Sequence, residues 1–284
     1  MVDDPEVLVS TAWLAERLGA PGLRVLDASW YLPDAGRDPR AEYEAAHVPG
    51  ARFVDLDAVS DAASPLPHTA PGADAFAAAL AAAGVGRGDA AVVYDAADGG
   101  PFSAPRLWWL LRAHGVRAAV LDGGLRRWRA EGRPVEAGAP EGAAAEAPAL
   151  GARPGFFRDA DAVAAGRAQV VDARAAARFR GEAPEPRPGL RAGHVPGARS
   201  LPFPLLFRAD GTMKDAAGLR AAFEAAGVAL DRPVVTSCGS GVTAAIVNLA
   251  LARLGHGDHA LYDGSWSEWG LDPARPVETG EARA

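Results

Sequence analysis

The hexapeptide HVPGAR occurs twice in this sequence, at residues 47–52 and 194–199. Each copy is followed, in the same order, by two more matched blocks: VVYD (92–95) with VVTS (234–237), and VLDGGLRRW (120–128) with ALYDGSWSEW (260–269). A repeated order of blocks indicates that a whole folding unit was duplicated. The sequence therefore predicts two homologous domains.

Within each copy, short β-rich runs alternate with helical patterns, which predicts an α/β fold. We expect two tandem domains, each a mainly parallel sheet flanked by helices. The stretch 135–153 is rich in Ala, Pro and Gly, as an exposed connection would be. We place the N-terminal domain at 1–138, the linker at 139–153 and the C-terminal domain at 154–284.

Composition excludes several classes of protein. The 284 residues are 49% hydrophobic and 23% charged, close to ordinary globular usage. The 29 basic residues are outnumbered by 36 acidic ones, so no basic excess favours nucleic acid. No apolar stretch approaches a membrane span, and the acidic start lacks the basic region of a secretory signal, so we expect a cytoplasmic protein without membrane partners.

The chain has one cysteine, Cys238, which excludes an intramolecular disulfide and a multi-cysteine metal site. It follows the apolar run PVVTS and precedes the helical pattern AAIVNLALARLG. In an open parallel sheet, ligands bind where the carboxyl ends of strands lead into helices. The corresponding loop of the first copy, AADGGPFSAP, contains no cysteine, so chemistry is predicted in the second domain alone.

A cysteine on such a loop faces unpaired backbone N–H groups and the positive end of the helix dipole. Both favour the thiolate, which is the reactive form. Gly239 and Gly241 leave the loop amides free to point inward, and the same ring of amides would stabilise a negatively charged persulfide. The alternative is that Cys238 is a small buried hydrophobic residue.

The segments CGSGVTA, FSAPRLWWLLR, YDGSWSEWG and the paired HVPGA blocks together resemble the tandem-domain rhodanese sulfurtransferases, in their 3-mercaptopyruvate sulfurtransferase branch. The resemblance covers nearly the whole chain. It implies a catalytically inactive N-terminal domain and a C-terminal cysteine that cycles between thiolate and persulfide, with no metal or organic cofactor. Thiosulfate-using members carry basic residues after the cysteine, whereas this loop has Gly239 and Ser240, so mercaptopyruvate is the expected donor.

The resemblance also implies the site residues. Arg178 and Arg187 match positions that bind the substrate carboxylate and carbonyl, and an arginine fork suits such groups. Asp57 and His68 match an acid and a histidine that join Ser240 in a charge-tuning relay near the cysteine. The expected catalytic residues are Cys238, Ser240, Asp57 and His68, and the expected substrate-binding residues are Arg178, Arg187, Gly239, Gly241, Val242 and Thr243.

Other conspicuous residues receive structural interpretations. Arg174, Arg180 and Arg191 are expected to pair with Glu182 and Glu185 on a solvated loop. His47 and His194 occur in both halves, whereas the cysteine does not, so we expect them to hold a backbone turn. The tryptophans of the matched blocks are expected in the cores, and for Trp266 and Ser265 a place at the pocket stays open.

The expected reaction has two steps. The Cys238 thiolate takes sulfur from mercaptopyruvate and releases pyruvate, and an external acceptor, a thiol such as thioredoxin or cyanide in an assay, then removes the outer sulfur. One alternative is a thiosulfate:cyanide sulfurtransferase, and another is a persulfide carrier without small-molecule donor activity. A cysteine phosphatase is disfavoured because its phosphate-binding arginine is replaced by Ala244.

Overall fold

The computed structural model describes residues 3–138 and 144–282. The chain forms two compact units. Unit 1 comprises Met1–Ala62, Ala70–Arg153 and Arg208–Met213, and unit 2 comprises Ala63–Thr69, Pro154–Phe207 and Lys214–Ala284. Residues 139–143, the first part of the expected linker, lie outside the described residues. No helix in the described part of the chain is long and apolar enough to cross a membrane.

Unit 1 is built on a five-stranded parallel sheet with the strand order β1-β5-β4-β2-β3. Its strands are β1 (Leu8–Val9), β2 (Leu23–Asp27), β3 (Arg52–Phe53), β4 (Ala90–Tyr94) and β5 (Arg117–Leu121). Its helices are α1 (Thr11–Ala15), α2 (Pro39–Ala45), α3 (Ala73–Ala82), α4 (Ala104–Ala113) and α5 (Gly124–Ala130), with a 3₁₀ turn η1 (Pro33–Ala35).

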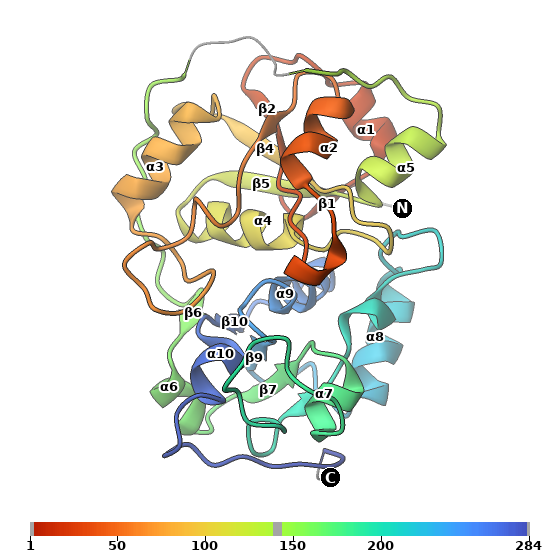
Figure 1. Cartoon of the computed structure of the whole chain (residues 1–284). Coiled ribbons are helices and arrows are strands. Elements are labelled where there is room, and N and C mark those ends of the chain that lie inside the picture. The colour runs from red at the N-terminus through yellow and green to blue at the C-terminus, as the bar shows by residue number, and fades with distance from the viewer. Residues whose placement is uncertain (1–2, 139–143, 283–284) are drawn as a thin grey trace. The chain divides into compact units, whose positions relative to one another are not determined.

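The central strands β4 and β5 are buried on both faces, which explains their continuous apolar runs. Side chains of β2, β4 and β5 that point to one face form a core with α1 and α5, and these two helices contribute Leu14, Leu125 and Trp128. Helices α3 and α4 lie on the opposite side of this sheet (Figure 1). Layers of helix on both faces are what parallel strands require, because each crossover connection covers a face.

Unit 2 repeats this plan, with a parallel sheet ordered β6-β10-β9-β7-β8. Its strands are β6 (Phe157–Arg158), β7 (Gln169–Asp172), β8 (Arg199–Ser200), β9 (Val234–Ser237) and β10 (His259–Tyr262). Its helices are α6 (Ala160–Ala164), α7 (Ala176–Arg180), α8 (Ala216–Ala225), α9 (Ala244–Arg253) and α10 (Ser265–Trp269), with a 3₁₀ turn η2 (Phe203–Leu206). The expected fold class is confirmed in both units.

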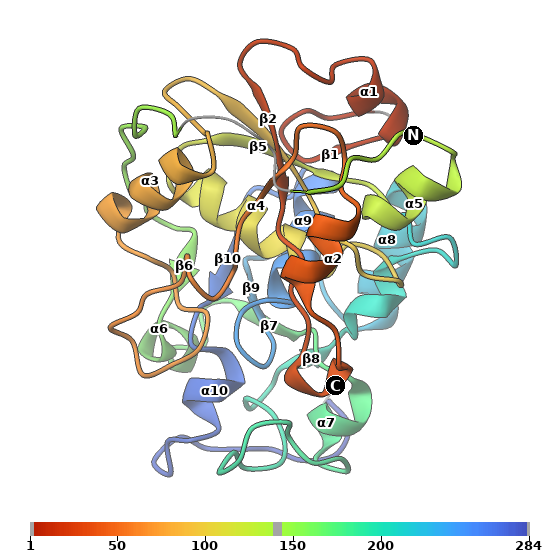
Figure 2. The ribbon, with the colours of Figure 1, turned by 45° about the horizontal axis from the view of Figure 1, so that its top comes forward.

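Helices α6, α7 and α10 share one core of unit 2 with β7, β9 and β10, including Phe179, Trp266 and Trp269. Helices α8 and α9 lie on the other side of the sheet, as the two views of Figures 1 and 2 agree. The tryptophans Trp108, Trp109, Trp128, Trp266 and Trp269 are all at most 3% exposed. Their expected place in the cores is confirmed.

The repeated histidines, His47 and His194, make the same contact in each unit. Nδ1 of His47 lies 2.8 Å from the carbonyl oxygen of Tyr43, and Nδ1 of His194 lies 2.8 Å from that of Phe179. Each ring stacks on the aromatic side chain of the residue whose carbonyl it contacts. Both histidines are therefore structural, as expected, although they bond the end of the preceding helix and not the Pro-Gly turn.

Asp27 should make the stability of unit 1 depend on pH. Its carboxyl group is buried at the end of β2, and burial raises its pKa to about 6 despite hydrogen bonds from Ser29. The folded protein thus holds this proton more tightly than the unfolded chain, so stability is full below about pH 4 and is lost as the pH rises through about 6.

The stability of the wild type relative to Asp27→Asn should therefore fall by about 2 kcal/mol between pH 4 and pH 7, because the amide stays neutral. Urea unfolding at both pH values measures this difference, with Asp34→Asn, at an exposed position, as the matched control. A difference that does not change with pH would contradict the assignment.

Candidate active site

Cys238 lies where the sequence predicted, directly after β9, with five residues between it and the start of α9. Its side chain is buried. The backbone N–H groups of Gly239, Ser240, Gly241, Val242 and Thr243 have no hydrogen-bond acceptor among the described residues. Since buried or half-buried amides normally find an acceptor, five consecutive free donors beside a thiol form a site ready for an anion.

A serine and a histidine meet beside this loop. Nδ1 of His68 lies 2.8 Å from Oγ of Ser240, and both side chains are buried. His68 has a φ of +61°, a left-handed conformation that non-glycine residues rarely adopt. Backbone strain of this kind persists where surrounding contacts hold the residue in one place. The expected pairing of His68 with Ser240 is therefore present within unit 2.

Asp57, the third member of the expected relay, belongs to unit 1. There its Oδ2 accepts a hydrogen bond of 3.0 Å from Nε1 of Trp30. Its role in a relay stays a prediction.

Two guanidinium groups lie against the loop. A Cβ built on Gly239 would lie 3.4 Å from Nη2 of Arg178 and 3.8 Å from Nη1 of Arg187. Arg187 also reaches Oγ of Ser240, with a long contact of 3.5 Å from its Nη2. Nε of Arg178 is buried and has no hydrogen-bond partner among the described residues. Both arginines thus sit where they can bind a carboxylate or carbonyl of a ligand that reaches Cys238.

Arg178 is held by a buried chain of charges. Glu185, whose side chain is 2% exposed, accepts from Nη2 of Arg178 and, at 2.6 Å, from Nη1 of Arg174. Arg174 is itself buried and pairs with Asp172 at 2.7 Å. The expectation that Arg174 pairs with Glu185 on a solvated loop was therefore right about the partner and wrong about the solvent.

The other two arginines of this stretch differ from each other. Arg180 pairs with the exposed Glu182 at 2.7 Å, as expected. Arg191 instead donates to the backbone carbonyls of Trp269, Gly270, Asp272 and Arg275, which ties its loop to the end of α10. Its expected pairing with a glutamate was wrong because four carbonyls at a helix end offer more acceptors than one carboxylate.

The first turn of α10 fixes the backbone of the cysteine loop. Oγ of Ser265 accepts from the N–H of Cys238 at 3.2 Å, and the N–H of Trp266 donates to the carbonyl of Cys238 at 3.0 Å. Oγ and N–H of Ser267 both donate to the carbonyl of Gly239. The sequence left the role of Ser265 open and gave no sign of Ser267, because both roles depend on contacts between segments far apart in the chain. It named Glu185 only as a partner of arginines on a solvated loop.

The corresponding loop of unit 1 is built on a different residue. In the parallel ladders Asp27 pairs with Tyr94, and Asp172 pairs with Ser237, so the residue after Tyr94 stands in the place of Cys238. That residue is Asp95. Its carbonyl accepts from Leu125 of α5, as that of Cys238 accepts from Trp266 of α10. The match of VVYD with VVTS was therefore one residue out of register.

The Asp95 carboxylate accepts hydrogen bonds from the loop amides of unit 1. It accepts from the N–H groups of Ala97, Phe102, Ser103 and Ala104, at 2.7 to 3.1 Å. Burial raises the pKa of this carboxyl, and the four amides oppose the rise. In unit 1, the loop amides are thus satisfied by a carboxylate of the chain itself. In unit 2, the corresponding amides stay without an acceptor among the described residues.

Comparison with known proteins agrees with the duplication. A family model described as a rhodanese-like domain matches residues 10–131 and again residues 160–272. The chain belongs to the rhodanese-like domain family. The first match includes the loop of Asp95, and the second match includes the loop of Cys238.

Individual rhodanese relatives match over nearly the whole chain. The human 3-mercaptopyruvate sulfurtransferase is 45% identical, over 95% of this chain and 94% of its own. The Escherichia coli K12 enzyme of the same name is 44% identical, over 95% and 97%. The crystal structure of SseA from Escherichia coli has a TM-score of 0.82 at 42% identity, covering 92% of this chain and 99% of that one. The expected family is confirmed.

Asp95 should be a large contributor to the stability of unit 1. Asp95→Ala removes the common acceptor of four amides, and each buried unsatisfied donor costs about 1–3 kcal/mol. We expect the free energy of unfolding in urea to fall by at least about 2 kcal/mol. Asp98→Ala, in the same loop but with an exposed side chain, is the matched control. Equal stability of Asp95→Ala and the wild type would refute this role.

Proposed function

We propose that this chain is a sulfurtransferase that takes sulfur from 3-mercaptopyruvate onto Cys238 and passes it to an external acceptor. The observation that carries the proposal is the meeting of a buried thiol, five unengaged loop amides and two arginines in unit 2. Relatives with this activity in their names match nearly the full length of the chain.

In the first step, the thiolate of Cys238 attacks the sulfur of the donor. A sulfur–sulfur bond forms, the carbon–sulfur bond breaks, and its electron pair leaves on pyruvate as an enolate. Protonation of the enolate carbon gives pyruvate. The outer sulfur remains as a persulfide, whose negative charge the N–H groups of Gly239–Thr243 are placed to stabilise.

Arg178 and Arg187 would hold the donor during this attack. Both guanidinium groups lie next to Gly239, one residue from the sulfur, and the buried Nε of Arg178 is a free donor for a carboxylate oxygen. Glu185 positions Arg178 and neutralises part of its charge. Gly239 and Ser240 are neutral, so the positive charge beside Gly239 comes from these two arginines, which favours a carboxylate-bearing donor.

Ser240 and His68 are suited to manage the proton. A hydroxyl within hydrogen-bond distance of an imidazole can pass a proton to a leaving enolate and recover it through the ring. Asp57 is proposed as the acid of the same relay, on the resemblance alone.

In the second step, an external thiol such as thioredoxin attacks the outer sulfur and restores the Cys238 thiolate. The acceptor must come from outside because the chain has no second cysteine to act as a resolving thiol. The single thiol also suits the reducing cytoplasm, which is where we propose that the protein acts.

Thiosulfate is the second candidate donor. The bovine thiosulfate sulfurtransferase is 43% identical over 92% of this chain, and an Arabidopsis thaliana relative, 42% identical, carries both donors in its name. Steady-state kinetics with each donor distinguishes them. A higher kcat/KM for mercaptopyruvate is expected, and a higher value for thiosulfate would replace our assignment. Turnover of neither donor would leave a persulfide carrier.

Removing a donor-binding arginine should impair mercaptopyruvate turnover. Arg187→Ala deletes a guanidinium beside the loop, so we expect kcat/KM to fall about 100-fold, the loss of a charge-assisted contact in the transition state. Arg180→Ala, in the same stretch but paired with exposed Glu182, should stay within about twofold. Unchanged kcat/KM in Arg187→Ala would exclude this mode of donor binding.

A further inference from the structure

Arg174 is a buried charge beside the candidate active site, and the steps of sulfur transfer proposed above assign it no role. Its side chain is 1% exposed, and every nitrogen of its guanidinium has an acceptor. Nε and Nη2 donate to Asp172 at 2.7 to 3.1 Å, Nη2 also donates to the carbonyl oxygen of Gly193 at 2.7 Å, and Nη1 donates to Glu185 at 2.6 Å. The centre of the guanidinium lies 4.5 Å from the centroid of the Trp266 ring. These contacts fix the side chain in one conformation.

The duplication shows that the backbone does not need an arginine at this position. In the parallel ladders Asp172 corresponds to Asp27 of unit 1, so Arg174 corresponds to Ser29. The N–H of Ser29 donates to the side chain of Asp27 at 2.8 Å, and the N–H of Arg174 donates to that of Asp172 at 2.9 Å. The same turn thus forms with either side chain. The arginine occurs in the unit that carries the thiol, which indicates a role in the site.

Glu185 links Arg174 to Arg178, the proposed carboxylate-binding group. The Glu185 side chain is 2% exposed and lies between two guanidinium groups, with Oε1 on Arg174 and Oε2 on Arg178. Arg178 has no other hydrogen bond or ion pair in the described part of the chain, and its Nε is buried without an acceptor there. The direction of Arg178 therefore depends on Glu185, and that of Glu185 depends on the buried arginine behind it.

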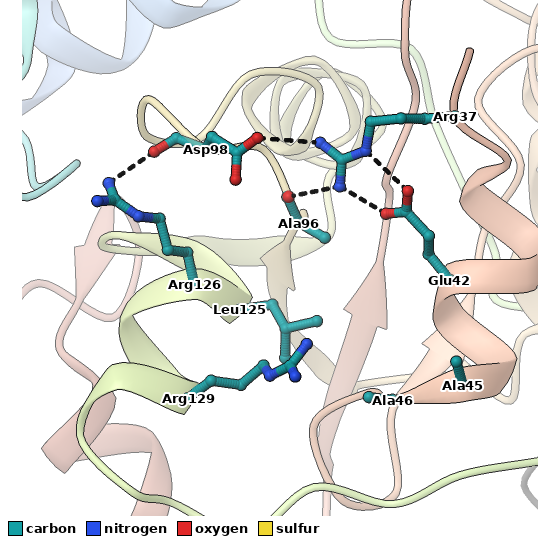
Figure 3. Close-up of a pocket in the computed structure, with 9 residues that line it drawn as sticks. All are labelled: Arg37, Glu42, Ala45, Ala46, Ala96, Asp98, Leu125, Arg126 and Arg129. Carbon is teal, nitrogen blue, oxygen red and sulfur yellow. Dashed lines mark hydrogen bonds and ion pairs between the residues drawn. The ribbon is translucent and has the colours of Figure 1, made fainter. Parts of the chain in front are cut away.

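An arginine beside the corresponding loop of unit 1 is held in a different way. Arg37, just before α2, faces Glu42 and the loop after β4 (Figure 3). Its Nε and Nη2 donate to the Glu42 carboxylate at 2.7 and 2.5 Å. Nη2 also donates to the carbonyl oxygen of Ala96, and Nη1 meets Asp98 at 3.4 Å. Acceptors of the chain itself thus engage all three nitrogens of Arg37, whereas Arg178 keeps its Nε for a ligand.

We propose that Arg174 is a positioning residue for the donor: through Glu185 it holds the Arg178 guanidinium in the direction in which the Nε–H meets the donor carboxylate. This inference rests on the function proposed above. Because every nitrogen of Arg174 is already bonded, it acts through Glu185 and not by direct contact. An arginine side chain loses rotational freedom when it binds a ligand, and fixing it beforehand removes that cost from binding. Arg178, held from behind, is preorganised for a carboxylate.

Alkylation of Cys238 tests the proposal without any transfer of sulfur. The thiolate attacks the CH₂Br carbon of 3-bromopyruvate or of bromoacetone; a carbon–sulfur bond forms, the carbon–bromine bond breaks, and bromide leaves with the electron pair. The first reagent carries a carboxylate where the second carries a methyl group. Cys238 is the only thiol of the chain, so the loss of free thiol reports on this site alone. The ratio of the two rate constants, divided by the same ratio for N-acetylcysteine, gives the carboxylate preference of the site.

Two charge-conserving variants of the full chain should each lower this preference about tenfold. Arg174→Lys keeps a positive charge beside Asp172, but an ammonium cannot bond Asp172 and Glu185 with the geometry of a planar fork. Glu185→Asp keeps the charge and both oxygens but is one methylene shorter, so it no longer spans the two guanidinium groups. The preference of Arg174→Lys/Arg178→Ala should equal that of Arg178→Ala, because Arg174 acts through Arg178.

The matched control is Arg191→Lys. Arg191 lies in the same stretch and donates to four backbone carbonyls at the end of α10, and to no carboxylate in the described part of the chain. This replacement disturbs the packing of the stretch without touching Glu185, so the carboxylate preference should stay within about twofold. Thermal unfolding checks that each variant is folded.

An unchanged carboxylate preference in Arg174→Lys, or in Glu185→Asp should Arg174→Lys fail to fold, would overturn the proposal. So would an equal loss in Arg191→Lys, a further loss when Arg174→Lys is added to Arg178→Ala, or a wild type without preference for the carboxylate reagent. A wild type that shows the preference but turns over no mercaptopyruvate would overturn the proposed function alone, and the variants would still decide the role of Arg174 toward a carboxylate.

Discussion

Backbone N–H groups at a strand-to-helix loop need an acceptor, and the two halves of this duplicated chain meet that need differently. In unit 1 the carboxylate of Asp95 accepts from four of them, and the loop is complete without a ligand. In unit 2 the equivalent residue is Cys238, too short and too weak an acceptor to satisfy the five amides that follow it. We propose that the negative charge that completes this loop comes from chemistry at the sulfur.

The residues around Cys238 fix the conformation of the loop, so that it need not change as the proposed persulfide forms and is consumed. Ser265, Trp266 and Ser267 at the start of α10 bond the backbone of the loop, so its amides keep their direction. The ion pairs of Glu185 with Arg174 and Arg178 do the same for the Arg178 guanidinium, which we propose binds the donor. Preorganised donors of this kind stabilise charge without reorganising during the reaction.

The two domains and the position of the candidate site could be predicted from motifs in the sequence. The paired HVPGAR blocks led to the two domains, and the glycine-framed cysteine before a helical pattern led to the position of the site. His68 with Ser240 and the two arginines at the loop followed from resemblance, and within unit 2 they lie together. The burial of Arg174 and the bridging role of Glu185 could not be foreseen, because an arginine with a nearby glutamate looks the same in sequence whether the pair is solvated or buried. The one-residue shift that puts Asp95 in the place of Cys238 is set by strand register, which two valines in each block leave ambiguous.

We propose that the open loop of unit 2 holds a sulfur-borne negative charge on Cys238. The most direct test is the intact mass of the full chain after incubation with 3-mercaptopyruvate and removal of excess donor. We expect the addition of one sulfur atom to the wild type and none to Cys238→Ser. A wild type that stays unmodified, or a Cys238→Ser variant that gains the same mass, would contradict it.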